Sequence, residues 1–181
     1  MAIGQVIVEG HAIVSEDGMI ADERGETPPG LRNDADWKLF QGALDRAALV
    51  VLGRLGHVRH PNPGRKRLVL SRSVTGLSPD AKDASAYVWN PADMPIAAVL
   101  ERLGVRQGTL AVTGGTGCFD LFLPLFDRFL LAEVAGLRIV RGTPCFSEGR
   151  PDEVLTDAGL APGERQVIDP SAGVTLTLWT R

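Results

Sequence analysis

The stretch AVTGGTGCF, residues 111–119, passes from a short apolar segment through three glycines and a threonine into a second apolar segment. This pattern is typical of a buried strand followed by a tight turn and a helix. Glycines at such a turn let the backbone approach a phosphate group closely, and the N–H groups that open a helix at Gly117 would add donors. The spacing is not that of the G-x-G-x-x-G fingerprint. Taken alone, the segment Gly114, Gly115, Thr116 and Gly117 fits a phosphate cradle and a plain turn equally well.

Segments rich in β-branched residues recur along the whole chain and alternate with segments of helical spacing. Eight strands are expected, over residues 5–14, 48–53, 67–71, 86–90, 109–115, 128–136, 165–169 and 174–180. Helices are expected from residues 34, 91 and 118, the first with Asn33 or Asp34 as its cap. The last two strands are separated only by PSAG and predict a C-terminal antiparallel hairpin. The predicted fold class is α/β, with an eight-stranded, mixed but mostly parallel sheet flanked by helices.

Length and composition indicate the general class of protein. The chain has 181 residues, which fits a single domain over residues 1–181, and its net charge of −3 argues against a nucleic-acid partner. No apolar run could span a membrane and no secretory signal is visible, so we expect a soluble, cytoplasmic protein. Cys118 and Cys145 are expected in the core. No metal site is expected, because His57 and His60 lie in a Pro/Gly-rich loop without acidic neighbours.

Basic and hydroxyl residues follow two further strands at the point where each strand ends. Gly53 and Arg54 close the second expected strand, and Ser71 and Arg72 close the third. Carboxyl ends of parallel strands meet at one edge of a sheet, so these groups would lie beside the glycine turn and could bind a phosphate on a ribose. The alternative is that the arginines are ordinary surface residues.

Asp36 opens an amphipathic helix directly after a long loop and lies one turn before Phe40. A carboxyl group at the wall of an apolar crevice has a raised pKa, so it can hold a proton near neutral pH and pass it to a ring nitrogen. The alternative is that Asp36 only complements the helix dipole.

These motifs together resemble dihydrofolate reductase and its wider superfamily, which includes the reductase domain of riboflavin biosynthesis. The resemblance covers most of the chain and rests on the order of SEDGMIAD (15–22), DADWKLF (34–40), VVLGR (50–54), PGRKRLVLSRS (63–73), VTGGTGCFDLFLP (112–124) and FDRFLLAEV (126–134). It implies a dihydrofolate reductase-like fold and an NADPH-dependent reductase that transfers hydride to a C=N bond of a pterin or a related small heterocycle.

The resemblance also implies roles for residues at matching positions. Asp36 matches the acid that assists protonation of the substrate, and the expected substrate-binding residues are Phe40, Arg65 and Thr113, with Arg65 holding a carboxylate of folate. The expected cofactor-binding residues are Ile20, Ala21, Gly53, Arg54, Ser71, Arg72, Gly114, Gly115, Thr116 and Gly117. Among these, Arg54, Ser71 and Arg72 would favour the 2′-phosphate of NADPH over NADH.

Three features depart from the family pattern. Ala132 stands where a threonine usually supports the acid, the loop after Ala21 has no tryptophan, and the Gly-Arg motif continues as Leu55-Gly56-His57. A riboflavin-biosynthesis reductase acting on a ribosylaminopyrimidine is therefore an alternative. A non-catalytic NADPH-binding module is another, and a structural or partner-binding α/β domain a third. The C-terminal hairpin would leave an edge strand that a homodimer could cover.

Overall fold

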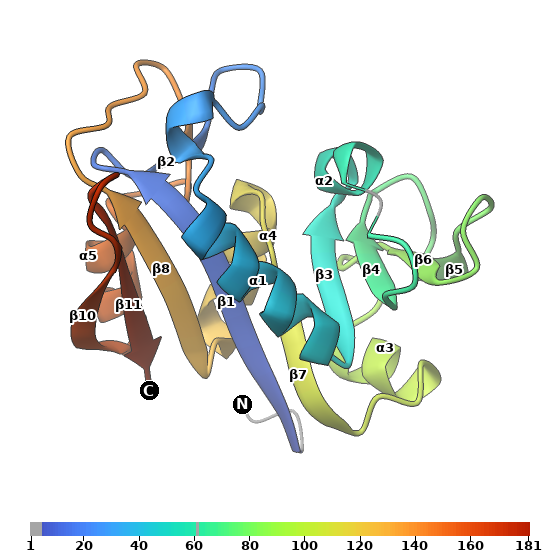
Figure 1. The fold of residues 1–181 in the computed structure, drawn as a ribbon. Coiled ribbons are helices and arrows are strands. Elements are labelled where there is room, and N and C mark those ends of the chain that lie inside the picture. Colours follow the sequence, from blue (N-terminus) through green and yellow to red (C-terminus); the bar gives the residue numbers. More distant parts are fainter. Residues whose placement is uncertain (1–4, 61) are drawn as a thin grey trace.

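The computed structural model describes residues 5–60 and 62–181 and has a continuous nine-stranded sheet at its centre (Figure 1). The strands of this sheet are β1 (Gln5–Ser15), β3 (Leu49–Gly53), β4 (Arg67–Leu70), β5 (Leu77–Pro79), β6 (Ala86–Trp89), β7 (Gln107–Val112), β8 (Arg128–Val134), β10 (Ala161–Asp169) and β11 (Val174–Thr180). The helices are α1 (Asp34–Arg46), α2 (Arg54–Arg59), α3 (Ile96–Arg102), α4 (Thr116–Phe122) and α5 (Pro151–Asp157). Two strands, β2 (Met19–Ala21) and β9 (Thr143–Pro144), form a separate antiparallel pair.

The strand order in the large sheet is β10-β11-β8-β1-β7-β3-β4-β6-β5. The strands from β8 to β6 in this order run parallel to one another. Strand β11 pairs antiparallel with both β8 and β10, and β5 pairs antiparallel with β6. The prediction of a mostly parallel sheet with a C-terminal antiparallel hairpin is confirmed. The residues that follow β1, β3, β4 and β7 therefore emerge at the same edge of the sheet.

The sheet has nine strands rather than the eight expected, because β5 extends the edge next to β6. Three residues ending in Pro79 are too few to show strand alternation, and proline is tolerated in an edge strand because one row of its N–H groups stays unpaired. Helix α2 was also not expected, since its residues belonged to a predicted loop. Its sequence signal is weak because Gly56 interrupts it and because Leu55 and Val58 are exposed.

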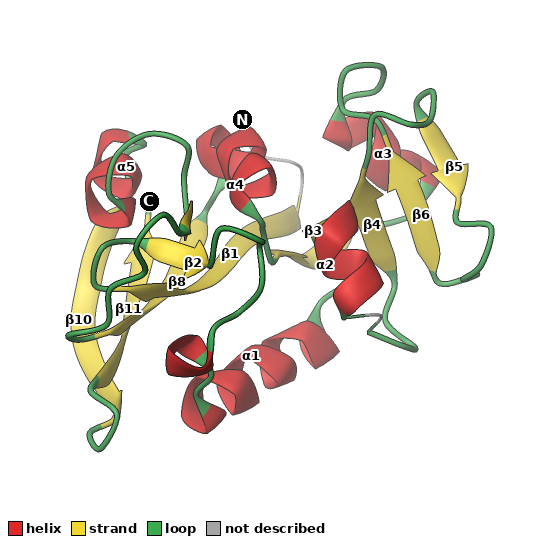
Figure 2. Ribbon diagram, turned by 90° about the horizontal axis from the view of Figure 1, so that it is seen from above, coloured by secondary structure: helices red, strands yellow, loops and turns green. Residues whose placement is uncertain are grey.

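Helices cover both faces of the sheet, as Figure 2 shows, with α1 on one face and α3, α4 and α5 on the other. Below α1, Leu44 packs against Val50, Leu52, Val69 and Ala111. The larger core on the opposite face contains Cys118 and Cys145, which are buried free thiols as predicted. Among residues 5–60 and 62–181, no helix is long and apolar enough to cross a membrane.

Candidate functional site

The glycine turn that follows β7 lies among the parallel strands of the sheet and meets two other segments there. The N–H of Gly53, at the end of β3, donates to the carbonyl oxygen of Gly114 over 2.9 Å. Ile20, in β2, has its Cδ1 3.8 Å from the place that a Cβ at Gly115 would occupy. Ala21, next to Ile20, is buried and pairs with Thr143. The fold therefore brings together β2, the end of β3 and the glycine turn.

The backbone of the turn is tightly packed at one glycine and open at two others. Gly114 has a φ of +91°, and a Cβ there would lie 2.8 Å from Cε2 of Phe119, so a larger residue does not fit. The peptide bond between Gly114 and Gly115 is cis. Gly115 and Gly117 are exposed, and a Cβ on Gly117 would meet nothing within 4 Å. A ligand could approach the backbone closely at these two residues.

The two threonines of this segment use their hydroxyl groups within the fold. Thr113 donates from Oγ1 to the carbonyl oxygen of Val51 over 3.3 Å, and Thr116 donates from Oγ1 to that of Pro144 over 2.5 Å. The first bond ties β7 to β3, and the second ties the start of α4 to β9. Both hydroxyl groups therefore hold the turn in place.

Arg54, Ser71 and Arg72 follow neighbouring parallel strands. Gly53 pairs with Leu70 across β3 and β4, so Arg54 and Ser71 lie directly after paired positions. The Ser71 hydroxyl group accepts from the N–H of Ser73 over 3.1 Å and shares a 2.7 Å hydrogen bond with the Ser73 hydroxyl. Arg54 and Arg72 are exposed, and within residues 5–60 and 62–181 neither makes a hydrogen bond or an ion pair. Two unpartnered guanidinium groups are thus available to an anion at this edge.

The first turn of α1 is fixed by Asn33, which is the cap, rather than by Asp34. Oδ1 of Asn33 accepts from the N–H of Asp36 over 3.0 Å, and Nδ2 of Asn33 donates to Oδ2 of Asp169 over 2.7 Å. Because Asp169 ends β10, this second bond anchors the start of α1 to the C-terminal hairpin. The position of Asp36 is thereby set from two sides.

The carboxyl group of Asp36 is half-buried and accepts no hydrogen bond from any residue in the described part of the chain. Burial raises the pKa of Asp36 to about 6, while the nearby imidazole of His11 acts in the opposite direction. A carboxyl group with such a pKa is partly protonated near neutral pH and can serve as a proton donor.

His11 and Glu9 also belong to this site, although neither was expected there from the sequence. His11 is 6% exposed, its Nε2 lies 2.7 Å from Oε1 of Glu9, and its ring centroid is 5.7 Å from that of Phe40. Glu9 also accepts from Nε of Arg128. Burial works to raise the pKa of Glu9, but His11 and Arg128 together hold it below its usual value. The signal was two polar residues at positions i and i+2 in an otherwise apolar strand, which places them on the same face.

Ala132, which is expected from the sequence at the position of the family's threonine, is fully buried in β8 beside Ile13 of β1. It packs in an apolar cluster with Leu31, Val134 and Val174. The Ala132 side chain offers no hydroxyl group, and the side chain that lowers the pKa of Asp36, His11, comes from β1.

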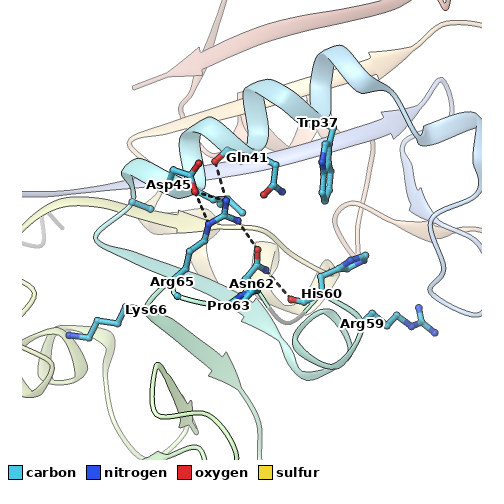
Figure 3. A pocket seen from close by; sticks show the side chains of 12 residues that line it. Trp37, Gln41, Asp45, Arg59, His60, Asn62, Pro63, Arg65 and Lys66 are labelled. Carbon is cyan, nitrogen blue, oxygen red and sulfur yellow. Dashed lines mark hydrogen bonds and ion pairs between the residues drawn. The ribbon is translucent and has the colours of Figure 1, made fainter.

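A cavity of about 630 Å³ lies beside the C-terminal half of α1 and is lined by Trp37, Gln41, Leu44, Asp45 and Ala47 and by residues 59, 60 and 62–66 (Figure 3). We call it the outer cavity. The rings of Trp37 and Phe40 lie 5.9 Å apart, so the outer cavity adjoins the region of Asp36. Arg65 lies in its wall, where it is hydrogen-bonded to Asp45 and Asn62. A second cavity, of about 710 Å³, lies beside α4 and α5 and contains none of the predicted site residues.

The solved structures that are similar to this chain include three proteins of known or named activity. The dihydrofolate reductase from Enterococcus faecalis, complexed with NADP(H) and RAB-propyl, has 19% sequence identity and a TM-score of 0.69 over 98% of both chains. A protein from Shewanella sp. PV-4 named as a riboflavin biosynthesis protein has 21% identity and a TM-score of 0.65, over 97% of this chain and 98% of that one.

The third is the diaminohydroxyphosphoribosylaminopyrimidine deaminase/5-amino-6-(5-phosphoribosylamino)uracil reductase from Thermotoga maritima, with 16% identity and a TM-score of 0.68. It is matched over 97% of this chain and 56% of its own length. No family model and no curated protein sequence matches the chain. The strand order, the C-terminal hairpin and these three similarities show that the chain has the fold of the dihydrofolate reductase-like superfamily.

Proposed function

We propose that the protein is an NADPH-dependent reductase that transfers hydride to a C=N bond of a pterin or a related small heterocycle. One observation carries the proposal. The open glycine turn and the two unpartnered arginines, Arg54 and Arg72, lie at the carboxyl edge of a sheet, and a half-buried carboxyl group without hydrogen bonds, Asp36, lies on the face of that sheet covered by α1. An anionic dinucleotide and a proton donor are what such a reaction requires.

The residues at the edge fit NADPH better than NADH. The 2′-phosphate of NADPH carries negative charge that guanidinium groups bind through charge-assisted hydrogen bonds. Arg54 and Arg72 have no competing partner in the described part of the chain, and the Ser71 hydroxyl group lies between them in sequence. Exposed backbone at Gly115 and Gly117 leaves room for a pyrophosphate or nicotinamide. The NADP(H) complex of the Enterococcus faecalis reductase supports this choice of cofactor.

The residues on the α1 face would complete the reaction. When bound, a reduced nicotinamide supplies the hydride that goes to the carbon of the C=N bond. Asp36 donates its proton to the nitrogen, which gives an amine N–H and leaves an aspartate that is recharged from solvent. His11 keeps the pKa of Asp36 from rising further, and the ring of Phe40, one turn along α1, packs against the His11 ring.

A riboflavin-pathway reductase, acting on a ribosylaminopyrimidine, is the second candidate. It is favoured by the buried methyl group of Ala132, which gives Asp36 no hydroxyl partner on β8, and by the similarity to the Shewanella and Thermotoga maritima proteins. The two candidates share the same cofactor and differ in the substrate.

The test follows NADPH oxidation with dihydrofolate, with a dihydropterin that lacks the glutamate tail, and with a ribosylaminopyrimidine. We expect turnover of a pterin, and Asp36→Asn should lower kcat about 100-fold or more, because a general acid contributes that much. Turnover of the pyrimidine alone would favour the second candidate. Tight NADPH binding without turnover of any substrate would point to the non-catalytic module.

Cofactor binding is tested separately by titration. Arg54→Gln and Arg72→Gln should each weaken NADPH binding by about tenfold or more and leave NADH binding nearly unchanged, because each removes a charge-assisted contact to the 2′-phosphate. The matched control is Arg106→Gln, an exposed arginine before the amino end of β7 that has no partner in the described part of the chain. Absence of NADPH binding to the unmodified protein would refute the proposed function.

A further inference from the structure

Arg65 is not free to hold a carboxylate of a substrate, because the fold already supplies acceptors for its guanidinium group. Its Nε and Nη2 donate to Oδ1 of Asp45 over 3.0 and 2.6 Å, and its Nη1 donates to Oδ1 of Asn62 over 2.7 Å (Figure 3). The carbonyl oxygen of Gln41 lies 3.5 Å from Nη2. The Arg65 side chain is only 16% exposed, so few donors remain for a ligand.

The other cationic residues of the outer cavity are engaged elsewhere. Lys66 points away from Arg65 in Figure 3 and donates from Nζ to the carbonyl oxygen of Leu103 over 2.6 Å. Arg59 donates to the carbonyl oxygens of Gly25 and Arg24. In the described part of the chain, the cavity therefore presents no arginine or lysine whose charged group is free of a partner.

We propose that Asp45 is a specificity-determining residue. Because its carboxylate occupies the guanidinium group of Arg65, an anionic group of a substrate cannot bind there, and the outer cavity selects substrates whose tail is uncharged. This rests on the proposed function, since the tail belongs to a heterocycle whose ring lies near Asp36. A tail ending in a carboxylate or a phosphate would have to displace Asp45 from Arg65 or lie beside it, and like charges repel.

The shape of the site agrees with a tail that extends along α1. Asp36 and Asp45 are nine residues apart in one helix, which corresponds to about 14 Å along its axis. The indole of Trp37, 53% exposed, lies between these ends and offers an aromatic face, while Gln41 and Asn62 offer amide groups. These groups suit an aromatic or hydroxyl-bearing neutral tail.

The test uses two probes of the tail alone, N-(4-aminobenzoyl)glutamate and its uncharged diamide, titrated into the full ¹⁵N-labelled protein. The indole N–H signal of Trp37 reports on the outer cavity, because Trp89 and Trp179 are buried in the core on the other face. The unmodified protein should bind the diamide at least as tightly as the glutamate form. Asp45→Asn should improve binding of the glutamate form about five- to tenfold and leave the diamide unchanged, the size expected for a partly exposed ion pair.

Two further variants make the interpretation specific. Asp157→Asn removes the same charge from the last turn of α5, on the opposite face of the sheet, and should change neither affinity. The double variant Asp45→Asn with Arg65→Gln should lose the improved binding of the glutamate form that Asp45→Asn alone produces. The proposal is overturned if the unmodified protein prefers the glutamate form, if Asp45→Asn leaves the ratio of the two affinities unchanged, or if neither probe shifts the Trp37 signal. The proposed function is judged independently by NADPH binding, to which neither Asp45 nor Arg65 contributes.

Discussion

Replacing Asp36 with asparagine should make the protein more stable at alkaline pH while it removes the proposed proton donor. Burial raises the pKa of Asp36 from its ordinary value of 3.8 to about 6 in the folded protein. The unfolded chain therefore ionises first as the pH rises, and folding loses free energy between about pH 4 and pH 6, with no further loss above. A shift of about 2 units at about 1.4 kcal/mol per unit corresponds to about 3 kcal/mol. Asp36→Asn should recover most of this, less a few tenths of a kcal/mol for the lost interaction with the helix dipole.

The measurement is urea unfolding of both proteins at pH 8 and at pH 4, followed by circular dichroism. The free energy of unfolding of Asp36→Asn should exceed that of the unmodified protein at pH 8, and the difference should shrink to about 0.5 kcal/mol at pH 4, where the carboxyl group is protonated in the folded protein and about half protonated in the unfolded chain. Asp34→Asn is the matched control, because Asp34 is exposed in the same turn and its change should stay within about 0.5 kcal/mol. The explanation by burial would be wrong if Asp36→Asn were no more stable than the unmodified protein at pH 8. It would also be wrong if the gain in stability were as large at pH 4 as at pH 8.

Three other substitutions test neighbouring parts of the site and the core. His11→Asn removes the imidazole that lowers the pKa of Asp36, so the alkaline limb of the pH profile of kcat, where Asp36 loses its proton, should move to higher pH; an unmoved limb would contradict this role of His11. Gly10→Ala would place a Cβ in steric conflict with the ring of Phe129 and should destabilise the protein by about 1–3 kcal/mol in urea unfolding. Asn33→Ala removes the cap of α1 and should cost about 1 kcal/mol in the same assay, and an unchanged unfolding midpoint would contradict the capping role.

Much of the fold could be predicted from the sequence because its strands are apolar, β-branched and bounded by turn residues. The hairpin of β10 and β11 was evident from Pro170 and Gly173 between two such runs, and the structure confirms it. Strand β5 could not be found, since its three residues show no alternation and its pairing is decided by β6. Helix α2 was missed for a related reason: it packs little of its own surface, so no amphipathic pattern marks it.

The candidate site, like the fold, could be predicted from the sequence only in part. Gly53 and Gly114 could be placed together because they lie at the carboxyl ends of the parallel strands β3 and β7. The hydrogen bond between them agrees with that placement. The partnership of Arg65 with Asp45 could not be predicted, because it joins a loop to a helix 20 positions away and depends on how α1 lies over the sheet. Glu9 and His11 carry a sequence signal as two polar residues on one face of an apolar strand, but only the fold shows that His11 meets Phe40 and acts on Asp36.

The environment of Asp36 contains the imidazole of His11 on β1, while the buried side chain of Ala132 on β8 has no hydroxyl group. Ala132 and His11 lie on the adjacent strands β8 and β1. The side chain that lowers the pKa of Asp36 therefore comes from β1 and not from β8. A hydroxyl group would stabilise the ionised carboxylate through a hydrogen bond, whereas His11 acts on Asp36 through its charge, with no hydrogen bond between the two side chains in the described part of the chain. Burial has the larger effect of the two, so the pKa of Asp36 stays above its ordinary value although His11 lowers it. A proton donor stops working when it loses its proton, so the displacement expected for His11→Asn belongs to the alkaline limb of the profile.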